Sequence, residues 1–315
     1  MEHTVEKINN QFSKDVISGL SRPTKRLSSK YFYDEKGDKI FQQIMQLDSY
    51  YLPQAELEIL KTQASAMMEG YDHERFELIE LGAGDGSKTV YFIEKLLAAG
   101  KQPIYRPLDI SADVLATNRA LMNARLPSLT VQSIAGDYFK TLSAIDKATP
   151  KVILFMGSNI GNYENESAIN FLKQVRAHTQ SGDRLLVAFD LKKNPKVILN
   201  AYNDVEGVTR QFNLNLLERI NRELAGNFEL AAFDHYPTYD PLTGITYSFI
   251  VSLKKQTVQV NGQAFNFKNG EVILTEVSQK YDLEQIEALK TAAGFGSAQH
   301  FMDSRGYYSI SVFEN

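Results

Sequence analysis

The chain has 315 residues, of which 43% are hydrophobic and 23% charged, and its formal net charge is −4. This balance is typical of a globular protein with one large or two medium domains. The acidic excess argues against non-specific nucleic-acid binding, which needs a basic surface. The absence of cysteine excludes disulfides and thiolate nucleophiles, and the five scattered histidines predict no metal site. Without a signal peptide or a long apolar run, we expect a cytoplasmic protein with no membrane partner.

The predicted elements change in character along the chain. Residues 1–60 are expected to be largely helical, with Pro53 marking the turn into a helix. From residue 76 to about 195, short apolar runs such as FELIELGAG alternate with helical segments such as TVYFIEKLLAAG, which predicts a parallel sheet with right-handed crossovers. Residues 196–230 again have a helical pattern. Residues 231–281 are rich in strand formers, with Asn-Gly turn signals in VNGQAF and FKNGEV.

This order predicts an α/β protein with two domains. A doubly wound domain is expected at 57–195, completed by a helix and a strand within 282–315. A second domain is expected to contain 196–281. The periodicity alone does not assign residues 1–56 to either domain.

A glycine-rich turn follows the first strand of the predicted sheet, in LIELGAGDGSKT at 78–89. Gly82 and Gly84 allow a sharp turn and close approach of a ligand to the backbone. The pattern does not by itself distinguish nicotinamide, flavin and S-adenosylmethionine. Glu80 within it would repel a pyrophosphate and favour a sulfonium or ammonium group. Asp109, at the end of the next strand, is placed to accept hydrogen bonds from ribose hydroxyls; the less favoured alternative is that the glycines only tighten a turn and Asp109 caps a helix.

Polar residues also follow the later strands of this sheet. AGDY contributes Asp137 and Tyr138, where an adenine ring could meet a carboxylate and an aromatic face, and FMGSNIGNY contributes Asn159 and Asn162. In open α/β sheets ligands bind beyond the carboxyl ends of the strands. Each residue alone would fit a solvated loop, but their succession predicts a site.

One strand near the C-terminus has polar residues at alternating positions. In ILTEVSQKY, Glu276 and Ser278 share one face, opposite Thr275 and Val277, because successive side chains of a strand point to opposite faces. Taken alone, this pair fits an exposed polar face.

These motifs resemble those of the histidine-specific Nα-methyltransferases of ergothioneine biosynthesis, which use S-adenosylmethionine. The resemblance extends over nearly the whole chain, through KYFYDEKGDKIFQQIMQLDSYYLPQAELEIL, ELGAGDGSKT, GSNIGNY, AYNDVEGVTRQFNLNLLERINREL and LTEVSQKY in that order. The glycine loop is generic to methyltransferases. The YFYDEKG, GSNIGN, INREL and TEVS segments are specific to this family.

The resemblance implies a fold and an activity. The fold is a Rossmann-like class I methyltransferase domain with a second, α+β substrate-binding domain that takes in residues 1–56 as well as 196–281. The activity is methyl transfer from S-adenosylmethionine to the α-amino group of L-histidine, up to N,N,N-trimethylhistidine. We expect a monomer without a metal.

The resemblance also implies roles for individual residues. Tyr33 and Asn162 would be catalytic, with Tyr33 close to the amino group. Asn162 and Tyr202 would hold the amino-acid end of the substrate, and Tyr50, Glu276 and Ser278 would hold the imidazole. The residues implied at the cofactor are Gly82, Gly84, Lys88, Asp109, Asp137 and Tyr138.

The sequence departs from the family at one position and leaves alternatives open. Tyr247 in GITYSF stands where the family often has a methionine lining the imidazole pocket, so substrate size and the number of methyl groups transferred stay open. The substrate could be a thiol-substituted histidine or another aromatic amino acid. A nicotinamide-dependent oxidoreductase and a non-catalytic small-molecule-binding protein are the alternatives from other classes.

Overall fold

The computed structural model describes residues 2–136, 138–143, 145 and 148–315. The chain forms two compact units. The first unit comprises the chain up to Tyr51 together with Lys193–Ser278, and the second comprises Leu52–Lys192 with Gln279–Asn315. Each of the three domain boundaries expected from the sequence lies a few residues C-terminal to the boundary in the structure. Within the described residues, no helix has the length and apolar character needed to cross a bilayer.

The second unit is built on an eight-stranded sheet, as far as the chain is described. Its strands follow the order β13-β14-β7-β6-β2-β3-β4, and the short β5 also pairs with β3. Neighbours from β7 to β4 run parallel, whereas β14 is antiparallel to both β7 and β13. The bounds are β2 Arg75–Leu81, β3 Gln102–Asp109, β4 Thr130–Val131, β5 Ile134–Ala135, β6 Lys151–Phe155, β7 Arg184–Asp190, β13 Ala298–Met302 and β14 Tyr308–Glu314.

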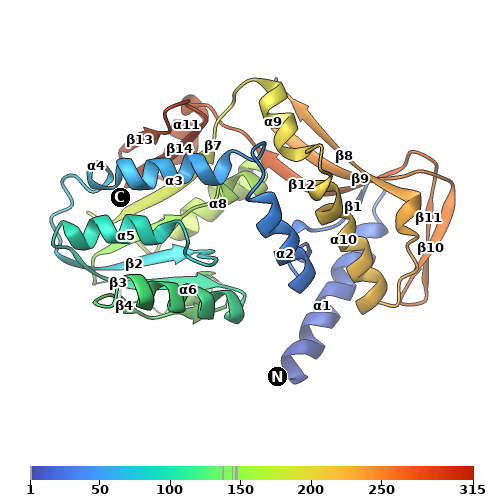
Figure 1. The fold of residues 1–315 in the computed structure, drawn as a ribbon, viewed down its shortest axis with the longest axis horizontal. Coiled ribbons are helices and arrows are strands. Elements are labelled where there is room, and N and C mark those ends of the chain that lie inside the picture. Colours follow the sequence, from blue (N-terminus) through green and yellow to red (C-terminus); the bar gives the residue numbers. More distant parts are fainter. Residues whose placement is uncertain (1, 137, 144, 146–147) are drawn as a thin grey trace. The chain divides into compact units, whose positions relative to one another are not determined.

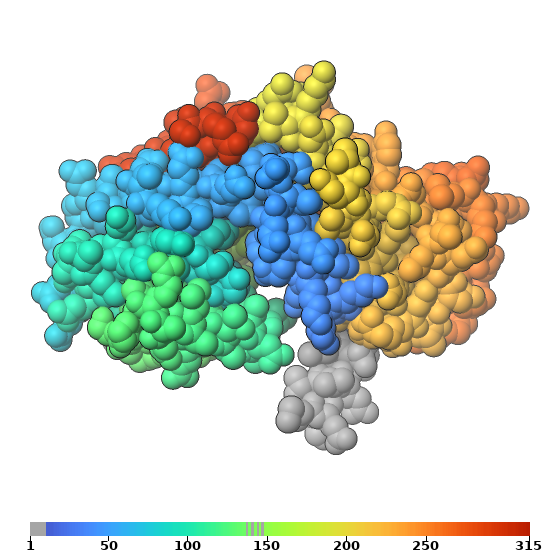
Figure 2. Space-filling view, viewed as in Figure 1, coloured from blue at the N-terminus to red at the C-terminus, as the bar shows by residue number. Residues whose placement is uncertain are grey.

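Helices cover both faces of this sheet, as the alternation of apolar runs predicts. Apolar residues of α8 and α11 share a core cluster with strand residues such as Ile79, Ile153 and Phe189. On the other face α3 contacts both α5 and β14, and α6 contacts β3. Figures 1 and 2 show α3 and α5 side by side on the surface. The helices are α3 Leu52–Thr62, α4 Ala64–Met67, α5 Thr89–Ala98, α6 Ala112–Arg125, α7 Tyr138–Leu142, α8 Asn165–Arg176 and α11 Leu283–Ala293.

The first unit contains a four-stranded sheet of order β1-β12-β9-β8 and a separate β10–β11 hairpin. Its core combines apolar residues of α1, α2 and α10 with those of the strands, among them Phe212, Phe233 and Ile250. The helices are α1 Glu2–Leu20, α2 Glu35–Ile44, α9 Pro195–Tyr202 and α10 Val208–Glu223. The strands are β1 Lys25–Arg26, β8 Phe233–Asp240, β9 Ile245–Ser252, β10 Gln256–Val260, β11 Gln263–Phe267 and β12 Val272–Gln279.

The two Asn-Gly signals have different outcomes. Asn261 and Gly262 have φ of +47° and +76° and close the β10–β11 hairpin, as their tolerance of left-handed backbone predicts. The turn at Gly270 instead connects β11 to β12, which belongs to the four-stranded sheet. The Gly270 amide donates a hydrogen bond to the carbonyl of Ser252 on β9 of that sheet. A turn residue fixes the local backbone but leaves open which strand the chain joins next.

Candidate active site

The glycine loop between β2 and α5 contains three glycines in left-handed backbone conformations. Gly82, Gly84 and Gly86 have φ of +75°, +55° and +74°, which residues with a side chain rarely adopt. A Cβ on Gly82 would lie 2.8 Å from the Tyr138 hydroxyl, and one on Gly86 would lie 2.7 Å from Asn118 Nδ2. A Cβ on Gly84 would meet no described atom within 4 Å. Open space therefore borders the backbone of Gly84, where a ligand can approach it.

Asp109, the last residue of β3, holds this loop. Its Oδ2 accepts a hydrogen bond from the Gly84 amide and its Oδ1 one from the Ser111 amide, both at 3.1 Å. Ser111 is the N-cap of α6, so the carboxylate fixes both the loop and the start of that helix. Tyr138, the first residue of α7, lies against Gly82. The predicted site residue Asp137 lies outside the described residues.

Lys88 is the N-cap residue of α5, and its ammonium forms an ion pair with Glu56. Glu56 lies on α3 and is fully buried. It also accepts a hydrogen bond from the Gly157 amide at 2.7 Å. Glu56 is not among the site residues that the sequence motifs predict. The signal was its place on the apolar face of α3, at helical spacing from Leu52 and Ile59.

The structure corrects the argument based on Glu80. This carboxylate is 2% exposed and accepts hydrogen bonds from the hydroxyls of Thr89, at 2.6 Å, and Tyr105. Tyr105 in turn accepts a hydrogen bond from Asn118, whose amide also donates to the Gly84 carbonyl. Glu80 therefore supports the loop from inside the protein, and its charge cannot serve to choose between cofactors. The sequence pattern of β2 does not show whether the Glu80 side chain points toward a ligand or into the protein interior.

Glu80 makes stability depend on pH. Burial raises its pKa to about 7 from an ordinary value of 4.5, although the two hydroxyls oppose the shift. Because the folded pKa is raised, the folded state binds the proton more tightly, and stability falls as the pH rises from about 4.5 to about 7. Glu80→Gln removes this titration. We compare the free energy of unfolding of Glu80→Gln with that of the parent protein at each pH. We expect this difference to shift in favour of the variant by about 3 kcal/mol between pH 5 and pH 8.

Urea denaturation at the two pH values measures this difference. Glu94→Gln is the matched control, because Glu94 forms its ion pair with Arg125 at the surface; it should change stability by less than about 1 kcal/mol at either pH. If the advantage of Glu80→Gln is the same at pH 5 and pH 8, the protonation of Glu80 is not linked to folding.

The loop after β6 carries the two predicted asparagines. Gly157 and Ser158 have φ of +73° and +58°, and the 3-10 helix η2, Asn159–Asn162, follows. Ser158 Oγ accepts a hydrogen bond from the Asp190 amide at 2.9 Å, which anchors the loop to the end of β7. The Asn159 amide donates to the carbonyl of the preceding Met156, so Asn159 closes the turn. Asn162 is exposed at the end of η2.

Glu276 and Ser278 are not on a freely exposed polar face. On β12, Ser278 is 6% exposed and accepts a hydrogen bond from the Tyr202 hydroxyl at 2.9 Å. Glu276 is half-buried, and Ser248 Oγ donates to its Oε2 at 3.5 Å. Thr275, which precedes Glu276 and points to the opposite face of β12, is buried and donates to the Asn213 side chain of α10 at 2.9 Å. The β12 pair is therefore held among polar partners within the first unit.

Tyr33 belongs to the same neighbourhood. Its ring meets those of Phe41 and Phe212 edge to face, with centroids 5.5 and 5.6 Å apart. Tyr33 is 47% exposed as a whole residue, but the protein around its hydroxyl partly desolvates it, which raises the pKa of Tyr33, and the nearby carboxylate of Glu276 raises it further. The phenol therefore stays neutral across the working pH range and can orient or relay a proton without acting as a phenolate base.

The other two predicted tyrosines of the first unit lie on different elements. Tyr50 is half-buried, with its ring edge to face against Phe41 at a centroid distance of 6.5 Å. Tyr247 stacks on Phe249 at 5.8 Å, on the half-buried face of β9. Ser248, on the alternate face, has the hydrogen bond to Glu276. Ser248 is not among the predicted site residues, since a serine in an alternating strand has no distinctive signal.

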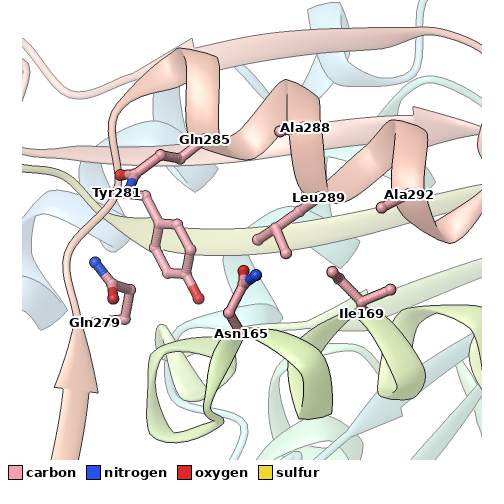
Figure 3. Close-up of a pocket in the computed structure, with 8 residues that line it drawn as sticks. All are labelled: Asn165, Ile169, Gln279, Tyr281, Gln285, Ala288, Leu289 and Ala292. Carbon is pink, nitrogen blue, oxygen red and sulfur yellow. The ribbon is translucent and has the colours of Figure 1, made fainter. Parts of the chain in front are cut away.

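A pocket of about 400 Å³ lies in the second unit, and none of the residues that line it is a predicted site residue. Figure 3 shows Leu289 and Ala292 of α11 facing Ile169 of α8, with the Tyr281 hydroxyl directed toward Asn165. Tyr281 donates a long hydrogen bond to the Ile160 carbonyl of η2, at 3.5 Å. The pocket therefore lies behind η2 and is not formed by the glycine loop.

Comparison with known proteins identifies the family. Residues 12–315 match the family described as "Histidine-specific methyltransferase, SAM-dependent". The Histidine N-alpha-methyltransferase of Mycobacterium tuberculosis is 32% identical over 95% of this chain and 93% of its own length. Ergothioneine biosynthesis protein 1 of Schizosaccharomyces pombe is 26% identical over 91% of this chain and 38% of its own length.

A solved structure supports the fold. The structure of mitomycin 7-O-methyltransferase aligns with 98% of this chain and 68% of that chain, with a TM-score of 0.50 and 13% sequence identity. This similarity confirms the Rossmann-like class I methyltransferase fold and shows nothing of the substrate. The resemblance drawn from the motifs is also confirmed, since the family match covers all of them. The chain belongs to the family of histidine-specific, S-adenosylmethionine-dependent methyltransferases.

Proposed function

We propose that this enzyme transfers a methyl group from S-adenosylmethionine to the α-amino nitrogen of L-histidine. One observation carries the choice of substrate: Glu276 and Ser278 on one strand are held by Ser248 and Tyr202, respectively. A fixed carboxylate beside a fixed hydroxyl suits the N–H and the ring nitrogen of an imidazole. The activity named for the Mycobacterium tuberculosis relative supports the same substrate.

The loops of the second unit fit S-adenosylmethionine. The open space at Gly84 lets a ligand reach the backbone, and the Asp109 carboxylate lies beside it. We propose that Gly82 and Gly84 approach the cofactor closely, that Asp109 and Asp137 accept hydrogen bonds from it, and that Lys88 and Tyr138 complete the site. When bound, the cofactor supplies an electrophilic methyl group on a sulfonium.

The side chains of the enzyme have to orient a neutral amine. Methyl transfer from a sulfonium is an in-line displacement, so most of the available acceleration comes from positioning the nitrogen lone pair. A carboxylate on the amine would stabilise the ammonium form and oppose the reaction. We propose that Asn162 and Tyr202 hold the amino-acid end, because an amide and a neutral phenol orient the amine without stabilising its charge.

The imidazole end determines which amino acid is accepted. We propose that Glu276 accepts a hydrogen bond from one ring nitrogen and that Ser278 meets the other. Tyr50 would pack beside the ring. Tyr247, where the family often has methionine, would limit the size of the pocket.

Tyr33→Phe tests the proposed proton relay. Tyr33 is neutral, is close enough to Glu276 and Tyr202 for both to raise its pKa, and is 47% exposed. We propose that its hydroxyl accepts the amine proton while giving its own proton to solvent water. We expect kcat to fall about 100-fold, with the pH–rate profile keeping its shape because Tyr33 does not ionise in the measured range. A pH–rate profile from pH 6 to pH 9 measures both, and a full rate throughout would contradict the relay.

A substrate panel tests the proposed function. S-adenosylhomocysteine release is measured with L-histidine, a thiol-substituted histidine, L-tryptophan and L-phenylalanine. We expect L-histidine to give the highest kcat/KM, with L-phenylalanine lower by about 10⁴-fold, because it leaves the buried polar groups unpaired. A higher value for the thiol-substituted histidine or for tryptophan would move the assignment to that substrate. No release with any of them would favour a binding protein.

A further inference from the structure

Glu56 is a buried carboxylate whose partners come from separate loops of the second unit. Its side chain is 1% exposed and forms the ion pair with Lys88. Its Oε2 accepts hydrogen bonds from the Gly157 amide at 2.7 Å and from the Tyr308 hydroxyl at 2.5 Å. Its neighbours on the buried face of α3 are apolar, among them Ala55 and Ile59. The carboxylate therefore lies in an apolar layer and is compensated by these donors.

The two loops bound by Glu56 have different tasks in the proposed function. Lys88 begins α5 directly after the glycine loop, and Gly157 begins the loop that carries Asn162. They follow the carboxyl ends of β2 and β6, which pair in parallel. One side chain thus fixes the loop assigned to the cofactor and the loop assigned to the amino acid.

Stability alone does not account for this carboxylate. A buried ionised group costs several kcal/mol of desolvation, and well-packed apolar residues of similar volume are often as stabilising or more so. What an apolar residue cannot do is accept hydrogen bonds from a lysine and a backbone amide together. The backbone of Gly157 is left-handed, with φ of +73°, and an external acceptor fixes the direction of its N–H.

We propose that Glu56 is a positioning residue that couples the two loops, so that each ligand binds more tightly when the other is present. This inference rests on the proposed assignment of Lys88 to the cofactor and of Asn162 to the amino acid. Without the charge of Glu56, both loops lose a fixed orientation, and both ligands bind more weakly. Coupling between ligands is reciprocal, so it is measurable from either one.

Glu56→Gln tests the coupling, because glutamine keeps the shape and removes the charge. We expect the KM values for S-adenosylmethionine and for histidine each to rise about tenfold, with a smaller change in kcat. We expect Lys88→Met to raise mainly the KM for S-adenosylmethionine and Asn162→Ala to raise mainly the KM for histidine. Glu58→Gln is the matched control on the same helix, since Glu58 binds Ser304 instead and should leave both values unchanged.

Two further measurements do not depend on turnover. Calorimetry gives the affinity for S-adenosylhomocysteine with and without histidine, and we expect the enhancement by histidine to be lost in Glu56→Gln. Hydrogen exchange should become faster in residues 157–162 and 82–89 of Glu56→Gln, and in neither segment of Glu58→Gln. If Glu56→Gln does not fold, Glu56→Asp, with its shorter reach, has the same expected results.

The outcomes separate this inference from the proposed function. The inference is wrong if Glu56→Gln changes only the S-adenosylmethionine value, with exchange in 157–162 unaltered, or if it lowers only the melting temperature. If the parent protein does not bind histidine, the proposed function fails. Hydrogen exchange in Glu56→Gln then tests whether Glu56 couples the two loops. Faster exchange in both 82–89 and 157–162 supports the coupling, and unchanged exchange in either segment contradicts it.

Discussion

Lys280→Met is expected to lower the free energy of unfolding by about 3–5 kcal/mol, because it removes the cation that compensates a buried carboxylate. Lys280 and Asp190 are both fully buried, and Lys280 Nζ lies 2.8 Å from Asp190 Oδ2. The backbone joins the same two segments, since the Tyr281 amide donates to the Asp190 carbonyl at 2.9 Å. The pair therefore fixes the chain just after Ser278, where β12 leaves the first unit.

Urea denaturation of the two proteins measures this loss. Lys192→Met is the matched control, because Lys192 forms an ion pair of the same length, 2.8 Å, with Asp282, and both side chains are partly exposed. We expect the control to lose less than about 1 kcal/mol. Equal losses in the two variants would show that burial of the Lys280–Asp190 pair has no special importance for the fold.

Glu276→Ala is expected to have the largest effect on substrate choice. The half-buried carboxylate has Ser248 as a partner and is proposed to accept the imidazole N–H. Its loss should lower kcat/KM for histidine by about 10²-fold or more, since a buried substrate N–H is then left unpaired. The preference for histidine over phenylalanine should shrink as well, because phenylalanine never made this hydrogen bond.

Steady-state kinetics with both amino acids measure the two effects. Glu271→Ala is the control for loss of a carboxylate close to β12, since Glu271 pairs with Lys25 at 2.5 Å and is not placed at the substrate. We expect it to leave the ratio of the two kcat/KM values unchanged. An unaltered kcat/KM for histidine in Glu276→Ala would rule out Glu276 as the imidazole acceptor.

Features set by local sequence were predictable. The glycine loop requires left-handed backbone at Gly82 and Gly84, and the structure has it at both. The parallel sheet follows from apolar runs that are buried on both faces, as in β6 and β7. The expected helical stretch from 196 to 230 contains α9 and α10, with a break before the N-cap of α10 at Gly207, whose φ is +73°.

Features set by tertiary contacts were not predictable. Glu56 and Lys280 are charged residues that become buried only because donors or acceptors arrive from distant segments. Glu80 looked like a ligand contact and instead has internal hydroxyl partners. The short β1 and the edge strand β13 were not predicted. β1 has only two residues, and β13 is a partly exposed edge strand, so neither has a clear alternation of apolar and polar residues.

The position of the added methyl group shows whether the enzyme methylates the α-amino nitrogen of histidine. The protein is incubated with L-histidine and isotopically labelled S-adenosylmethionine, and the product is analysed by tandem mass spectrometry and NMR. Label on the α-amino nitrogen, with an unmodified imidazole, is the predicted result, and the number of labelled methyl groups gives the extent of transfer. Label on a ring nitrogen, or histidine that stays unlabelled, would contradict the assignment of Glu276 and Ser278 to the imidazole.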